Sequence, residues 1–162
     1  MNYSLRLLGL ALLLVSAWLV GAGYAAYCKR RLRVISAFVS LISHIEKRVT
    51  LFLSTQSDLL SGYENSDISE FVEQARFGKG LYEAFLAVSG KLPISEEIKK
   101  SLSDFFSDFG KSYKDRELKR ISMFLDELTE EQKLEEEKTP ARIKLAYTLL
   151  FAAAGSLVII LL

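Results

Sequence analysis

The chain has 162 residues, enough for one modest domain, of which 50% are hydrophobic and 25% are charged. A single cysteine excludes a disulfide-bonded secreted scaffold, the apolar content excludes a disordered tail, and 21 basic against 20 acidic residues exclude nucleic-acid binding by bulk charge. The apolar residues are concentrated in two blocks, residues 7–28 with 18 apolar positions and residues 145–162 with 15. This distribution predicts a polar domain, residues 29–144, between two membrane segments.

The first block, residues 7–28, is predicted to be an uncleaved membrane-spanning helix. As a helix it would be about 33 Å long, close to the thickness of a hydrocarbon core. A secretory signal peptide is the alternative, but the apolar run is longer than in such peptides and a basic cluster follows it directly. That cluster consists of Lys29, Arg30, Arg31 and Arg33. Because short basic segments stay in the cytoplasm, the cluster determines the topology and predicts that the following chain is cytoplasmic.

The first block also carries a face of small residues, Ala17, Gly21 and Ala25, at intervals of four. Such a face permits close packing of membrane helices, either between the two spans or between copies of the chain, which would make a homo-oligomer. Neither block contains Asp, Glu, Lys, Arg or His, so no proton relay or ion path is predicted within one chain.

Apolar residues at helical spacing continue to about residue 52, which predicts that the first helix extends out of the membrane. Residues 54–57 are expected to interrupt it. Asp67 is predicted to cap a later helix, with Glu70 three residues on as in a capping box.

Further breaks divide the rest of the polar domain. Gly78 ends one predicted helix, and Ser95 caps another, which Gly110 closes. A long helix is expected over residues 112–138, and Pro140 is expected to restart the helix that becomes the second span. The predicted fold class is all-α, with two transmembrane helices flanking a cytoplasmic antiparallel bundle of about five to six helices.

The second block, residues 145–162, is predicted to be the other transmembrane helix, about 27 Å long. Lys138, Arg142 and Lys144 precede it, and no basic residue follows it. Both spans therefore place residues 29–144 in the cytoplasm, and both termini on the opposite side of the membrane.

The near-neutral total charge hides two oppositely charged regions. Residues 29–48 contain six basic residues and one acid, whereas residues 54–137 contain 19 acids and 11 bases. The basic region suits anionic headgroups, so the domain is expected to present an acidic face to the cytosol. The candidate partner-docking residues on that face are Glu130, Glu131 and Glu135. A solvated charged surface without a partner is the alternative interpretation.

The catalytic inventory is small. His44 is the only histidine, and Cys28 the only cysteine, so no zinc site, Cys-His pair or Ser-His-Asp set is expected. The acidic pairs lie on predicted solvent faces, and the glycines around residue 79 lack the spacing of a phosphate-binding loop. We expect no enzyme activity, no cofactor, no metal and no small-molecule substrate.

The order of these features resembles the stage III sporulation protein AB family of endospore-forming bacteria. The features that carry the resemblance are the span ending in residues 29–33, Phe109-Gly110-Lys111-Ser112 ahead of a long helix, the acidic run at residues 135–138, and the apolar run from residue 154 onward. The chain departs from the family pattern at Tyr113, where Asp is usual, and at Phe85, where Trp is usual.

The resemblance implies a domain similar to the cytoplasmic domain of the inner-membrane platform protein of type II secretion and type IV pilus machines. It further implies an integral-membrane assembly component of the channel between mother cell and forespore, in the mother-cell membrane around the forespore. The implied partners are a cytoplasmic secretion-type ATPase and the membrane-ring proteins of that channel. A membrane-anchored adaptor or regulatory protein is the alternative, and an unrecognised membrane enzyme is a more distant one.

Overall fold

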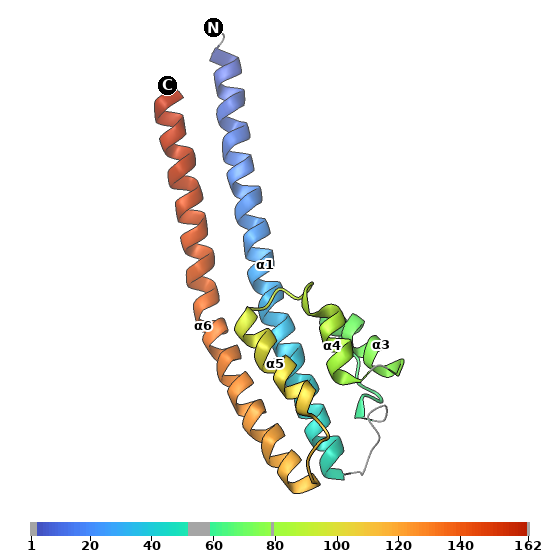
Figure 1. Ribbon diagram of the computed structural model, residues 1–162. Helices are drawn as coiled ribbons and strands as arrows, with labels where there is room; N and C mark the ends of the chain where they lie inside the picture. The colour runs from blue at the N-terminus through green and yellow to red at the C-terminus, as the bar shows by residue number, and fades with distance from the viewer. Residues whose placement is uncertain (1–2, 52–58, 79, 162) are drawn as a thin grey trace. The chain divides into compact units, whose positions relative to one another are not determined.

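The computed structural model describes residues 3–51, 59–78 and 80–161, and the interruption predicted at residues 54–57 lies outside them (Figure 1). All regular elements in these ranges are helical, which confirms the predicted all-helical class. The elements are α1 (Tyr3–Leu51), the 3-10 turn η1 (Ser66–Ile68), α3 (Ser69–Arg76), α4 (Leu81–Ser89), α5 (Glu96–Asp108) and α6 (Lys114–Leu161).

The chain forms two compact units, to which the two long helices both contribute. The terminal unit contains the described residues up to 29 and from 135 onward. The central unit contains the described residues between 30 and 134. Helix α1 is continuous over 49 residues, so the predicted extension of the first apolar helix into the polar domain is confirmed.

Four phenylalanines from four helices form the centre of the central unit. Phe38 comes from α1, and it meets the rings of Phe71, Phe85 and Phe106 from α3, α4 and α5, with centroid distances of 5.7, 5.9 and 6.4 Å. All four side chains are buried. Figure 1 shows the short helices α3, α4 and α5 beside the C-terminal part of α1. The aromatic cluster therefore fixes these helices on α1.

Several predicted helix boundaries are confirmed. The Ser95 hydroxyl accepts a hydrogen bond from the Ile98 amide (3.4 Å) and caps α5. Gly78 follows α3 with φ +89°, and Gly110 follows α5 with φ +80°. Both glycines adopt the left-handed conformation that ends helices and that other residues adopt at a cost.

The predicted cap at Asp67 is wrong. Asn65 lies two residues earlier, and its side chain accepts a hydrogen bond from the Asp67 amide (2.9 Å), which starts η1 before α3 begins. The Asp67 carboxylate pairs instead with Arg33 Nε (3.2 Å), and Glu70 pairs with Lys91. Because Asn65 provides the cap, the carboxylates of Asp67 and Glu70 are free to pair with residues of other elements.

The predicted restart at Pro140 is also wrong, because α6 passes through Pro140 without ending. An internal proline removes one backbone hydrogen bond, which kinks a helix more often than it ends one when strong helix formers lie on both sides. The preceding residue, Thr139, donates its hydroxyl to the Glu135 carbonyl (2.6 Å) inside the same helix.

Candidate functional site

The terminal unit exposes two long apolar helical surfaces. Both α1 and α6 contain an 18-residue window apolar enough to cross a membrane, and only 17% and 6% of these windows are buried within the chain. The core helix of a soluble protein would be mostly buried. Among the described residues, the large hydrophobic side chains on these surfaces that are at least half exposed are Leu12, Val15, Trp18, Leu19, Val20, Tyr27, Leu145, Leu149 and Ile159.

The predicted small-residue face lies partly against α6 of the same chain. A Cβ atom built on Gly21 would lie 2.7 Å from Cδ1 of Tyr147, and closer still to Cε1 of that ring. Ala17 is also buried, and Ala25 is half-buried. Of the two packing partners that the sequence left open, the structure places the other apolar helix of the same chain on Gly21.

The predicted topology-determining cluster lies on α1 directly after the first apolar stretch. Lys29, Arg30 and Arg33 are exposed, and Arg31 is half-buried. Arg33 also pairs with Asp67 of the central unit, so this charge has a structural contact as well.

The three predicted docking acids do not share one environment. Glu130 and Glu131 are exposed on α6. Glu135 is buried, and its Oε2 atom accepts a hydrogen bond from Arg142 Nη1 (2.8 Å). The expectation that Glu135 lies on the solvent face is therefore corrected, because its carboxylate is paired within the terminal unit. Docking through Glu130 and Glu131 stays a prediction.

A groove of about 430 Å³ lies between α5 and the N-terminal part of α6. Its floor contains the stacked rings of Phe105 and Phe124, whose centroids are 4.3 Å apart at an interplanar angle of 10°. The residues that line it are Ser101, Asp104, Phe105, Asp108, Arg120, Met123, Phe124 and Glu127. The groove thus combines an apolar floor with carboxylates from both helices.

A buried carboxylate holds the turn that leads from α5 into α6. Glu117 Oε1 accepts from the Gly110 amide (3.1 Å) and from Arg120 Nη2 (2.7 Å). The Arg120 guanidinium also lies 5.6 Å from the centroid of the Phe105 ring. This role of Glu117 was not predicted from the sequence. The available signal was an acid in the first turn of a helix that follows the helix end at Gly110, because such an acid can accept from free backbone amides.

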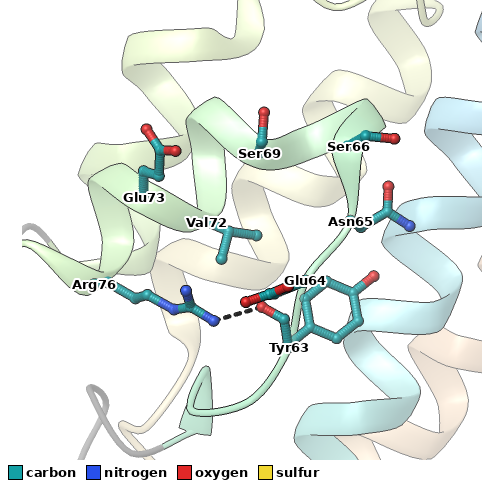
Figure 2. A pocket seen from close by; sticks show the side chains of 8 residues that line it. All are labelled: Tyr63, Glu64, Asn65, Ser66, Ser69, Val72, Glu73 and Arg76. Carbon is teal, nitrogen blue, oxygen red and sulfur yellow. Dashed lines mark hydrogen bonds between the residues drawn. The ribbon is translucent and has the colours of Figure 1, made fainter.

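A second, more polar cleft of about 340 Å³ lies beside α3 (Figure 2). Figure 2 shows the Arg76 guanidinium directed at the Tyr63 carbonyl, to which it donates a hydrogen bond (2.5 Å). The same guanidinium also donates to the Leu60 carbonyl (3.1 Å). The Tyr63 hydroxyl donates to the Ala37 carbonyl (2.8 Å), and burial raises the pKa of this phenol. The Tyr63 hydroxyl thus attaches the segment of residues 59–65 to α1 and Arg76 attaches it to α3, which is a structural role.

The single histidine and the single cysteine are both packed against other side chains. The His44 ring lies 5.3 Å from the Tyr63 ring, and burial, together with Arg48, lowers the pKa of His44 and favours the neutral imidazole. Cys28 is buried in the terminal unit. Among the residues that the structure describes, no group of three or more His, Cys, Asp or Glu side chains is placed to hold a metal ion.

The described residues define an all-helical protein with two helices long and apolar enough to cross a membrane. A family model for stage III sporulation protein AB matches residues 6–162. The chain belongs to this family and is therefore a sporulation-related protein. Neither a curated protein nor a solved structure matches the chain.

Proposed function

We propose that the chain is an integral-membrane platform of the channel between mother cell and forespore, where it docks a cytoplasmic secretion-type ATPase and packs against membrane-ring components. The observation that carries the proposal is the pair of uncovered apolar helices in a member of the stage III sporulation protein AB family. Its contribution is binding and assembly rather than catalysis. The membrane is the mother-cell membrane that surrounds the forespore.

The exposed apolar surfaces support membrane insertion. Burying a large apolar side chain is worth about 1.5–3 kcal/mol, so surfaces this long are strongly unfavourable in water. Tyr24 and Tyr27 are exposed on α1, within the five residues before Lys29. Aromatic residues next to basic ones are typical of the interface on the cytoplasmic side of a span.

The central unit is expected to face the cytoplasm. Protease added to the cytoplasmic face of inside-out vesicles should therefore degrade residues 30–134, because the basic residues before and after this unit keep it on that side. The products are measured by immunoblotting with antibodies to the central unit. Sealed right-side-out vesicles serve as the control and should protect it. Protection in inside-out vesicles would overturn the topology.

The proposed partners are tested by affinity purification of the intact tagged protein from sporulating cells, followed by mass spectrometry. We expect enrichment of a secretion-type ATPase and of membrane-ring components, relative to an unrelated tagged two-span protein prepared in the same detergent. The physical reason is that the acidic central unit offers charge contacts to the ATPase, and the uncovered apolar surfaces of the two spans offer packing contacts to the ring components. Enrichment of regulatory proteins alone would favour a membrane-anchored adaptor instead.

A further inference from the structure

The groove between α5 and α6 carries negative charge that the protein itself does not neutralise. Arg120 pairs with Glu117, and more distantly with Asp108 (3.9 Å), and Asp108 also pairs with Lys111. Asp104 and Glu127 are exposed, and within the described part of the chain neither has an ion pair or a hydrogen bond. One of these carboxylates stands on each wall, so a cation between the walls would meet both helices.

The floor of the groove is apolar and bordered by an exposed methionine. The rings of Phe105 and Phe124 are 5% and 9% exposed, whereas Met123 is 64% exposed. A flexible thioether adapts to irregular apolar partners and is common on surfaces that receive amphipathic helices. A merely solvated acidic face would not need a concave apolar floor, so the groove fits a ligand with an apolar anchor.

We propose that this groove docks an amphipathic helix of the cytoplasmic partner, with an apolar side chain on the Phe105–Phe124 stack and Lys or Arg residues facing Asp104 and Glu127. The inference rests on the proposed docking function and names its surface. Charge complementarity identifies the occupant as a basic protein segment, because the uncompensated groups are carboxylates on both walls.

The groove also connects to the acidic face of α6. Glu127 and Glu131 are four residues apart, and Glu130 is three residues after Glu127, so all three lie on one side of the helix. The exposed acids predicted for docking therefore continue the acidic wall of the groove along α6. A basic helix lying along α6 would place its apolar anchor in the groove and its positive charges along the acidic wall of α6.

Two variants and a matched control test the groove in the full-length protein in nanodiscs. Asp104→Lys with Glu127→Lys reverses both walls, and Met123→Gln removes the apolar border at nearly constant length. Glu83→Lys is the control, since Glu83 is an exposed acid on α4 and does not line the groove. With the purified secretion-type ATPase as ligand, we expect at least a tenfold loss of affinity for the charge variant, about threefold for Met123→Gln and less than twofold for the control.

A second experiment tests whether the groove binds a basic helix, independently of which protein is the natural partner. The chain has two methionines, so methyl-labelled protein gives two methionine signals, and Met123→Gln assigns one of them to Met123. A synthetic helical peptide with leucine flanked by lysines should shift the Met123 signal, and less so in the charge variant. An unshifted Met123 signal would overturn the proposal that the groove binds a basic helix. ATPase binding that is equal in all variants would do the same, whereas a shifted signal without any ATPase binding would reject the proposed partner and keep the groove.

Discussion

Replacing Phe38 with alanine is expected to lower the free energy of unfolding of the central unit by about 3–5 kcal/mol. The Phe38 side chain is fully buried and contacts the rings of Phe71, Phe85 and Phe106, which belong to three other helices. Its removal would leave a cavity at a position where α1, α3, α4 and α5 meet. Rigid neighbours fill such a cavity poorly, so the cost includes lost ring contacts as well as lost apolar burial.

The measurement is a urea titration of the full-length protein in detergent, followed by far-ultraviolet circular dichroism. Leu86→Ala is the matched control, because Leu86 is 50% exposed on α4 and its truncation should cost well under 1 kcal/mol. If Phe38→Ala and Leu86→Ala unfold at the same urea concentration, the aromatic cluster is not the centre of the fold. A partner-binding assay on the whole sample should show loss of docking in step with unfolding.

Local signals predicted most of the helices but not the way they meet. Ser95 and Gly110 are strong markers because a side-chain cap and a left-handed residue act within one turn. Asp67 failed because Asn65 competed for the same role two residues earlier. The expected restart at Pro140 is wrong because residues of high helix propensity on both sides of the proline continue α6 despite one missing backbone hydrogen bond.

The candidate site depends on contacts between distant segments, which spacing alone does not specify. Periodicity places Phe105 and Phe124 on the apolar faces of two different helices, but it does not predict that they stack and form the floor of a groove. Glu135 and Glu131 look equivalent in the sequence, yet one is buried against Arg142 and the other is exposed. Likewise, spacing does not predict that the Glu117 carboxylate accepts a hydrogen bond from the Gly110 amide after α5.

Replacing Gly21 with leucine is expected to disrupt the packing of the terminal unit. Even a single Cβ at this position would overlap the Tyr147 ring, whose Cδ1 atom would be 2.7 Å away. The ring is stacked at 18° on Phe151, so it has to leave a second aromatic contact to make room. Overpacking of this kind costs typically about 1–3 kcal/mol, which corresponds to a fall of about 2–10 °C in the melting temperature.

Gly23→Leu is the matched control, because a Cβ on Gly23 would meet nothing within 4 Å. Both variants add the same side chain two residues apart on α1, so a difference between them reports the contact with Tyr147 and not helix propensity or hydrophobicity. Thermal unfolding of the detergent-purified protein should show the loss for Gly21→Leu and a shift of less than about 1 °C for Gly23→Leu. Restoring space with Tyr147→Ala in the Gly21→Leu background should recover part of the loss, since the two side chains compete for one volume. Equal melting temperatures for the two leucine variants would show that the small-residue face does not pack on the Tyr147 ring.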